Sequence, residues 1–322
     1  MSVTAYRSVV VGVSSLERSL RLFRDVMQLR VEREGPVPRA LLDAWGVPPH
    51  VTAREAELSC KGYPFGRLRL VEYTPEPAQR VRLDFGPGAT DSPLDVGPKA
   101  IDFYVADPIG PWLERVVRAG CVARSAPRRH QIGHSISEEV VVSGPDELPM
   151  LLMVGHRHRP TSLRPGSPDG PFSEIATSSV VAGDLAATRR FYGEGLGLIA
   201  VNDAETPDEY RDLVDDLVDA PRGTRVHFLL YAQPGEASGK TLLVYFHGRS
   251  DRRLTGRMRP GHLGLSLFCH ETNDLDGLAR RLPTLGGTII TPPAAVATGT
   301  GPRRLMLVQG PNEELLELAE TP

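Results

Sequence analysis

The stretch DLAATRRFYGEGLGL at residues 184–198 decides the fold of this chain, because it shows how one repeating unit begins. A strand-like apolar run, Thr177–Val181, precedes it, and Asp184 is well suited to cap a helix. Phe191 and Tyr192 continue an apolar stripe at helical spacing, and the glycines that follow end the helix. The segment therefore predicts a strand, a polar turn and an amphipathic helix in that order.

The same order of elements occurs four times along the chain. The strand-like openings are Ser8–Val13, Ala100–Val105, Thr177–Val181 and His262–Phe268. Each opening leads into a turn, a helical stretch and further short strands, so each copy is β-α-β-β-β. We predict an α+β protein with four such modules at residues 6–74, 98–155, 173–248 and 260–321. Alternation along the strands favours sheets with one face on the helices and one face toward an open interior.

The polar segment Gly155–Phe172, rich in Pro, Gly and Ser, is the best candidate for the main domain boundary. We expect an N-terminal domain at residues 1–160 and a C-terminal domain at residues 171–322, joined by a linker at residues 155–172. The sequence leaves the pairing of modules open. Modules could pair one with two and three with four, or one with four and two with three.

Bulk composition excludes several classes of function. The chain has 322 residues, 40% hydrophobic and 24% charged, and a net charge of −3, which gives no case for nucleic acid or an anionic membrane surface. Its three cysteines lie far apart without a C-x-x-C pair, and its apolar runs are too short to span a bilayer. No signal peptide is evident. We expect a cytoplasmic monomer or homodimer that binds a small molecule.

Three segments resemble one known family. Residues 184–198 are similar to the opening of a module of the vicinal oxygen chelate superfamily, and residues 15–29 are a looser version of it. Residues 310–318 resemble the closing turn and strand of that family. The superfamily includes glyoxalase I, extradiol dioxygenases, methylmalonyl-CoA epimerase, fosfomycin-modifying enzymes and bleomycin-sequestering proteins. The resemblance covers nearly the whole chain and implies two half-open, barrel-like sheets with helices outside.

The resemblance also implies where a metal would bind, since family enzymes place one ligand in the first strand of a module and another in the last. The first-strand position falls on Ser8, near Ala100, on Thr177 and on His262. The last-strand position falls on Glu72, near Leu151, near Tyr245 and on Glu317. The resemblance therefore implies a metal site of His262, Glu317 and Glu72, which requires module one to pair with module four. One imidazole and two carboxylates suit Fe, Zn, Mn, Ni or Co.

Each of these residues also has a structural interpretation. His262 follows Pro260-Gly261 and could be an ordinary histidine at the start of a strand. Glu72 could cap a strand end near Arg67 or Arg69, and Glu317 could belong to a solvated acidic stretch. In that case the protein would use no metal.

Other residues are candidates on their own chemistry. Asp102 shares a strand face with Ala100 and could act as a catalytic base with a raised pKa inside a second cavity; the alternative is a surface or paired carboxylate. Glu72 is the other candidate catalytic carboxylate. Four histidines could donate to a substrate oxygen, although each alone is more simply structural: His130, His134, His227 and His247.

We favour an enzyme that acts on a small oxygen-rich molecule by metal-dependent lyase, isomerase or ring-cleaving chemistry, with natural-product metabolism as one setting. One alternative is a metal-free binding or resistance protein of the same fold, and a metal-free epimerase or cyclase using Asp102 or a histidine is another. A further alternative is an extradiol dioxygenase. The family's closing signature for that activity expects a Tyr and an Asp-Pro, where this chain has Leu307 and Gly310-Pro311, and Thr177 replaces a histidine.

Overall fold

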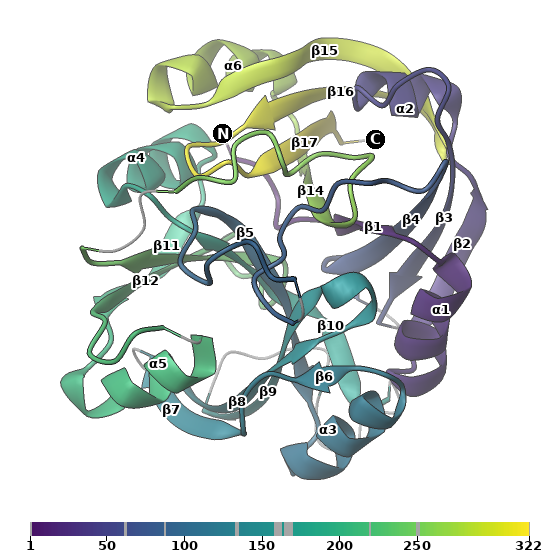
Figure 1. Ribbon diagram of the computed structural model, residues 1–322. Helices are drawn as coiled ribbons and strands as arrows, with labels where there is room; N and C mark the ends of the chain where they lie inside the picture. The colour runs from purple at the N-terminus through teal and green to yellow at the C-terminus, as the bar shows by residue number, and fades with distance from the viewer. Residues whose placement is uncertain are drawn as a thin grey trace.

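The computed structural model describes residues 2–60, 63–86, 88–132, 135–157, 163, 170–218, 220–248 and 252–321. Its strands form two open sheets with helices around their periphery (Figure 1). The predicted α+β fold with four β-α-β-β-β modules is therefore confirmed. Most of the predicted linker, at residues 158–162 and 164–169, lies outside the described residues, as does His134. The division into two domains stays a prediction.

Modules one and four supply the first sheet. Module one consists of β1 (Ser8–Val13), α1 (Leu16–Leu20), β2 (Arg30–Pro36), α2 (Arg39–Ala44), β3 (Thr52–Ser59) and β4 (Arg67–Thr74). Module four consists of β14 (Gly264–Thr272), α6 (Leu275–Arg281), β15 (Thr288–Thr298), β16 (Gly301–Gln309) and β17 (Leu315–Glu320). The strand order in this sheet is β15-β16-β17-β14-β1-β4-β3-β2.

Modules two and three supply the second sheet. Module two consists of β5 (Gly97–Val105), α3 (Ile109–Arg118), β6 (Val122–Ala123), β7 (Arg128–Ile132), β8 (Ser135–Ser143) and β9 (Pro149–Arg157). Module three consists of β10 (Phe172–Val181), α4 (Leu185–Arg189), β11 (Ile199–Glu205), α5 (Arg211–Val218), β12 (Val226–Ala232) and β13 (Lys240–Phe246). The order is β11-β12-β13-β10-β5-β9-β8-β6, and β7 pairs with β8.

Short helical turns complete the elements. The π-helical turns Arg21–Val26 and Arg190–Gly195 extend α1 and α4, and 3₁₀ turns lie at Pro145–Glu147, Asp208–Tyr210 and Leu282–Leu285. As predicted, Asp184 caps α4, because its carboxylate accepts from the amide of Ala187 at 2.9 Å. In the part of the chain that the structure describes, no helix has the length and apolar character needed to cross a membrane.

One antiparallel strand pair joins the two modules within each sheet. β1 pairs with β14, with Ser8 opposite Cys269, and β5 pairs with β10, with Asp102 opposite Thr177. Modules therefore combine one with four and two with three, which resolves the alternative that the sequence left open. The purple and yellow strands of the first sheet lie at the upper right of Figure 1, and the teal and green strands of the second lie at the lower left.

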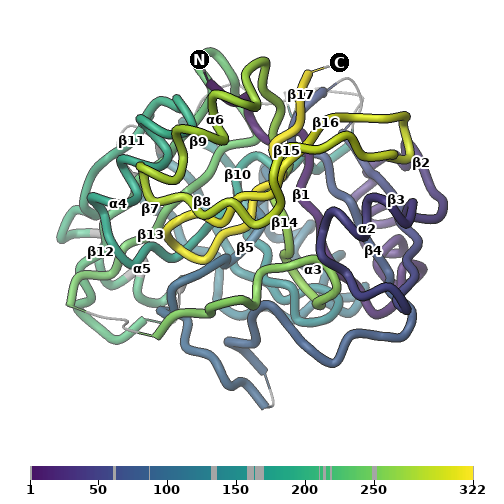
Figure 2. The backbone as a smooth tube through the Cα atoms, turned by 90° about the horizontal axis from the view of Figure 1, so that it is seen from above, coloured from purple at the N-terminus to yellow at the C-terminus, as the bar shows by residue number. Residues whose placement is uncertain are grey.

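Both ends of the chain bind to the end of β14. The amide of Thr4 donates to the carbonyl of Glu271 at 2.8 Å, and the amide of Thr321 donates to that of Thr272 at 2.9 Å. Figure 2 shows the two termini on the same side of the molecule. The first and last modules are thus held together by strand pairing and by both chain ends.

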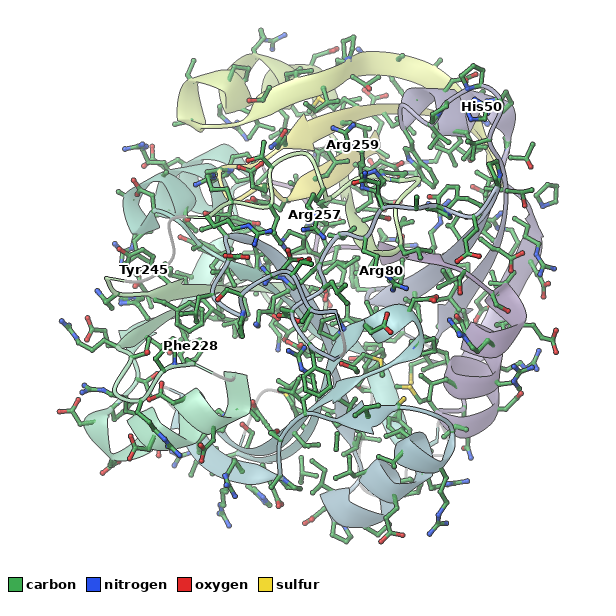
Figure 3. The ribbon with its side chains drawn as sticks, in the orientation of Figure 1. His50, Arg80, Phe228, Tyr245, Arg257 and Arg259 are labelled. Carbon is green, nitrogen blue, oxygen red and sulfur yellow. The ribbon has the colours of Figure 1, made fainter. Side chains whose placement is uncertain are left out.

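The connectors between modules one and two and between modules three and four pack against each other. The amide of Val96 donates to the carbonyl of Arg252, and the amide of Leu254 donates back to Val96, each at 2.9 Å. The guanidinium of Arg257 donates to the carbonyl of Arg80 at 2.9 and 2.7 Å, near the middle of Figure 3. These contacts link the connectors across the junction of the sheets.

A glycine at the junction of the two sheets allows them to approach closely. The amide of Gly66 donates to the carbonyl of Tyr6, and its own carbonyl accepts from the amide of Ile175 at 2.9 Å. Gly66 has a φ of +67°, and a Cβ there would lie 2.3 Å from the carbonyl oxygen of Ile175. Only glycine fits this position without displacing backbone.

We expect Gly66→Ala to destabilise the protein more than Gly46→Ala. Gly46 has a similar φ of +73° but open space where a Cβ would lie, so its replacement costs only the left-handed backbone penalty of roughly 1–2 kcal/mol. Gly66→Ala adds the clash with Ile175. Urea unfolding of both variants measures the difference, and equal losses of stability would contradict a close approach of the sheets at Gly66.

Candidate functional site

Each sheet bears a cavity. The larger one, about 540 Å³, lies in the sheet of modules two and three, and the smaller one, about 260 Å³, lies in the sheet of modules one and four. The larger volume is in the range of small-molecule sites.

A row of four side chains crosses the floor of the larger cavity. Thr177 on β10 lies opposite Asp102 on β5 and beside Lys240 on β13, and Asp102 lies beside Leu151 on β9. All four line the cavity. Strand pairing places directly registered residues on one face of a sheet, so the row is a consequence of register.

Asp102 is the most perturbed group in this row. Its side chain is only 2% exposed, and its Oδ1 is buried without a hydrogen-bond partner among the described residues. Burial raises the pKa of Asp102 well above its usual range, the charge of Glu139 raises it further, and Lys240 opposes the shift. A carboxyl that keeps its proton in a cavity can donate to a ligand oxygen or, once ionised, accept a proton.

A buried ion pair lies on another wall of the larger cavity. Nε2 of His130 lies 2.9 Å from Oε2 of Glu139, and the hydroxyl of Ser137 donates to Oε1 of Glu139 at 2.5 Å. Burial opposes the charge of both partners, but their mutual attraction prevails, so the pKa of His130 is raised and that of Glu139 is lowered. The pair is therefore charged, and its carboxylate favours the protonated form of Asp102.

Much of the remaining surface of the larger cavity is apolar. Its apolar lining includes Phe85, Val141, Met153, Val201, Leu217, Phe228, Leu230, Leu242, Val244 and Phe246. Phe228 is labelled in Figure 3. This surface suits the apolar body of a ligand, while the polar row receives its oxygen atoms.

Cationic groups also line the larger cavity, around Asp84. Lys99 and Arg124 line the cavity and lie 3.2 and 3.0 Å from the carboxylate of Asp84. Burial lowers the pKa of Lys99 to about 8. Burial alone would raise the pKa of Asp84, but the surrounding cations lower it to about 2. The cavity thus contains an amine that titrates close to neutral pH.

The smaller cavity has the equivalent row with different chemistry. Ser8 on β1 lies opposite Cys269 and beside Arg67, and Cys269 lies beside Glu317 on β17. Glu317 is 7% exposed and accepts a hydrogen bond from the indole Nε1 of Trp45 at 2.7 Å. Burial raises the pKa of the Cys269 thiol far above its usual range, which makes it a poor metal ligand.

Ion pairs between arginines and glutamates surround the rest of the smaller cavity. Glu55 is fully buried between Arg69 and Arg33, each at 2.7 Å. Arg303 pairs with Glu271 at 2.9 Å. Since these cations are matched by nearby carboxylates, the network orders the strands around the cavity and leaves little net charge for a ligand.

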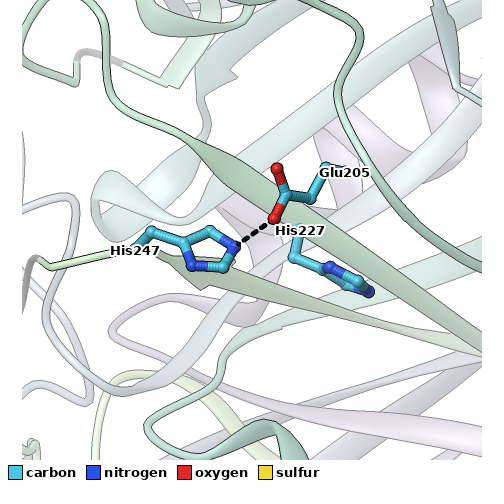
Figure 4. A group of neighbouring side chains, drawn as sticks. All are labelled: Glu205, His227 and His247. Carbon is cyan, nitrogen blue, oxygen red and sulfur yellow. Dashed lines mark ion pairs between the residues drawn. The ribbon is translucent and has the colours of Figure 1, made fainter.

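A third cluster lies outside both cavities. Glu205, His227 and His247 have ligand atoms that all lie within 4.8 Å of one another, and they are the only such group of three or more among the described residues (Figure 4). Nε2 of His247 lies 3.0 Å from Oε1 of Glu205. These three residues form a candidate metal site, which we call the outer cluster.

Comparison with known proteins agrees with the architecture. Residues 174–318 match the family model of the Glyoxalase/Bleomycin resistance protein/Dioxygenase superfamily. The matched residues make up the C-terminal part of the chain. The superfamily that the model describes is the vicinal oxygen chelate superfamily, so the resemblance predicted from the sequence is confirmed.

Solved structures with this fold span nearly the whole chain. Glyoxalase I from Zea mays is 15% identical with a TM-score of 0.65, over 98% of this chain and 92% of that one. A proposed dioxygenase from Bacillus subtilis strain 168 is 14% identical with a TM-score of 0.61, over 100% of this chain and 86% of that one. At such identity the likeness concerns the fold. A search of curated proteins finds no match.

The structure does not gather the three metal ligands that the superfamily resemblance implied. Glu72 accepts from the amide of Leu16 at 2.5 Å and from the guanidinium of Arg54 at 3.1 Å, so it binds the start of α1. Nδ1 of His262 lies 2.9 Å from the carbonyl oxygen of Arg257, in the connector before β14. Glu317 alone lines a cavity. The trio stays a prediction, and these contacts do not favour it.

Strand register explains the difference. On β14 the residue that lies opposite Ser8 is Cys269, whereas His262 precedes the strand. In module one the residues facing the smaller cavity from the last strand are Arg67 and Arg69, so Glu72 lies beyond it.

Neither cavity offers a fitting set of metal ligands in the described residues. The row of the smaller cavity supplies a thiol of raised pKa and one carboxylate that binds Trp45. The larger cavity contains His130, Glu139 and Asp102, but the first two are paired and the three are not gathered within 4.8 Å. We therefore derive no catalytic step through a metal in either cavity.

We expect Asp102→Asn to raise the melting temperature, and to raise it more at pH 8 than at pH 5. In the unfolded chain an aspartate such as Asp102 has a pKa of about 3.9, whereas in the folded protein the pKa of Asp102 is higher. The wild type is therefore favoured below about pH 4 and loses stability as pH rises toward the folded pKa. Thermal unfolding at both pH values measures this, with Asp43→Asn, at an exposed position of α2, as control. A pH-independent difference would contradict the raised pKa.

We expect Trp45→Phe to cost roughly 1–3 kcal/mol, because it leaves the buried carboxylate of Glu317 without its indole donor. Trp112→Phe is the matched control, since Trp112 packs on Phe172 by its ring. Denaturant unfolding compares the two variants. A loss no larger than that of the control would show that the hydrogen bond to Glu317 is unimportant for stability.

Proposed function

We propose that the larger cavity is the substrate site of an enzyme that moves a proton on a small molecule carrying a carbonyl or hydroxyl group, as an isomerase or lyase does. Asp102 is the acid–base residue. The observation that carries the proposal is the buried Oδ1 of Asp102, which has no hydrogen-bond partner among the described residues and belongs to a residue lining a cavity of about 540 Å³.

The surroundings of Asp102 support an acid–base role. Because its pKa is raised, the carboxyl keeps its proton to a higher pH than an ordinary aspartate, so it can donate that proton to a substrate and take one back. The charged pair of Glu139 and His130 maintains that shift. The ammonium of Lys240, two strands away in the same row, stabilises negative charge that develops on a substrate oxygen.

The lining indicates the class of substrate. A cavity of this size with a largely apolar wall takes a molecule with an apolar body, and the row from Asp102 to Lys240 takes its oxygen function. Lys99 and Arg124 add positive charge to the lining, which favours a substrate with an anionic or strongly polar group.

A second candidate function is binding without turnover, as in a sequestering or resistance protein. The apolar lining favours it, because such a surface holds a ligand by burial alone. A metal-dependent lyase or isomerase, or an extradiol dioxygenase, would require an imidazole and carboxylates gathered on one ion. In the described part of the cavities those ligands are paired elsewhere, so this form of the function is less well supported.

We test the proposal with small ketones and hydroxyketones that shift the melting temperature of the protein. Each is then incubated in D₂O, and NMR measures exchange of its C–H protons. The wild type should catalyse exchange, and Asp102→Asn should lose it by a factor on the order of 10²–10⁴ while still binding the ligand. Asp43→Asn, remote on α2, should keep it.

Three results would count against this function. Exchange that survives Asp102→Asn would remove that residue from catalysis. Exchange that a chelator abolishes and zinc or iron restores would support the metal-dependent alternative. Saturable binding without any exchange would support the sequestering protein.

A further inference from the structure

We propose that the outer cluster binds one divalent transition-metal ion of the zinc type, on the face of the second sheet opposite the larger cavity. The ligands are the carboxylate of Glu205 and the imidazoles of His227 and His247. This site is separate from the proposed substrate site and does not depend on it.

Strand register brings the three side chains to one face. Glu205 at the end of β11 lies directly opposite His227 on β12, and His227 lies opposite Tyr245 on β13. His247 follows Tyr245 by two residues, and its amide donates to the carbonyl of Arg225 at 2.9 Å, so the pairing continues to it. Residues two apart along a strand share a face.

That face is turned away from the larger cavity. Phe228 and Leu230 line the cavity, so His227, at the alternate position, points to the other side of β12. Tyr231, also at an alternate position, stacks on Tyr192 of the helical segment that follows α4. The outer cluster is therefore on the helix-covered face of the sheet, near the ends of its strands.

The three side chains offer the mixture of nitrogen and oxygen ligands that suits a metal ion of intermediate softness. Two imidazole nitrogens and one carboxylate oxygen are typical ligands of Zn²⁺, which binds them at about 2.0–2.2 Å and leaves a further position open. Nε2 of His247 is already 3.0 Å from Oε1 of Glu205, close to the spacing of two ligands on one ion. Small side-chain rotations would bring the third ligand in.

One ligand nitrogen is unsatisfied in the present arrangement. Nε2 of His247 is buried and makes no hydrogen bond among the described residues, although it lies close to Glu205. A buried nitrogen whose nearest carboxylate is not aligned for a hydrogen bond is costly. A metal ion bound between His247 and Glu205 would satisfy it.

A neighbouring carboxylate orients the other imidazole. Oδ1 of Asp203 lies 2.5 Å from Nε2 of His227, and the guanidinium of Arg189 binds both oxygens of Asp203 at 2.9 and 2.8 Å. This contact leaves Nδ1 of His227 available as the ligand atom. Carboxylates that hold the second nitrogen of a histidine are a common support of metal sites.

One cation competes with the metal for Glu205. The guanidinium of Arg225 lies 2.6 Å from Oε1 of Glu205, and both side chains are substantially exposed. An exposed pair of this kind contributes little stability, so a divalent ion can displace it. This competition provides a variant that should strengthen metal binding.

Titration of metal-stripped protein with ZnCl₂, followed with a chromophoric zinc indicator, tests the proposal, and Co²⁺ absorption reports the ligand geometry. The wild type should bind one ion that raises its melting temperature. His247→Ala and Glu205→Gln should each weaken binding at least ~10-fold. Arg225→Met should tighten it. His50→Ala, an exposed histidine labelled in Figure 3, is the matched control and should bind as the wild type does.

Circular dichroism of each variant without metal shows that it is folded, so a loss of binding cannot come from unfolding. Zinc binding that is unchanged in both His247→Ala and Glu205→Gln would overturn the proposal. The proposal would also be overturned if the metal-stripped wild type bound zinc no more tightly than a His247→Ala/Glu205→Gln double variant does.

Discussion

The pairing of β1 with β14 and of β5 with β10 is the constraint on which the rest of this structure depends. Each pair joins two modules whose first strands run antiparallel, and each first strand also pairs in parallel with the last strand of its own module. Four adjacent strands thus form the centre of each sheet, with the hairpins of the two modules on either side. This arrangement creates the two cavities and fixes which residues face them.

The two cavities occupy equivalent places in their sheets but differ in how the buried carboxylates near them are paired. Beside the smaller one, buried Glu55 lies between Arg69 and Arg33. The attraction of these two cations offsets the cost of burying its negative charge. In the larger one, burial and the charge of Glu139 raise the pKa of Asp102, and Lys240 opposes the shift only in part, so the carboxyl keeps its proton to a higher pH. The first arrangement stabilises a fold, whereas the second leaves a group whose protonation a ligand can change. Divergence of charge within one repeated scaffold is therefore the reason to assign function to the larger cavity.

The repeated pattern predicted the four modules, the helix cap at Asp184 and the open sheets, because these depend on periodicity and on local turn chemistry. It did not predict which residues share a cavity, because that depends on register between strands far apart in the chain. Asp102 was placed on the correct strand face because alternation within the expected strand Ala100–Val105 fixes which side chains share a face, although β5 begins earlier, at Gly97. The expected strand His262–Phe268 is instead β14, which begins at Gly264, so His262 lies before it. Module pairing could not come from one sequence either, because all four modules offer similar first strands.

The outer cluster also follows from the open form of the sheets. Because a half-open sheet is not closed on itself, β11 is left as an edge strand with only β12 beside it. Edge strands expose unpaired backbone groups and are commonly protected by charged side chains. Asp203 and Glu205 provide that protection here, each held by an arginine. His227 on β12 and His247 just after β13 lie beside Glu205. A carboxylate that protects the edge is therefore also one of three potential metal ligands. An ion bound by them would tie the edge strand β11 to the rest of its sheet.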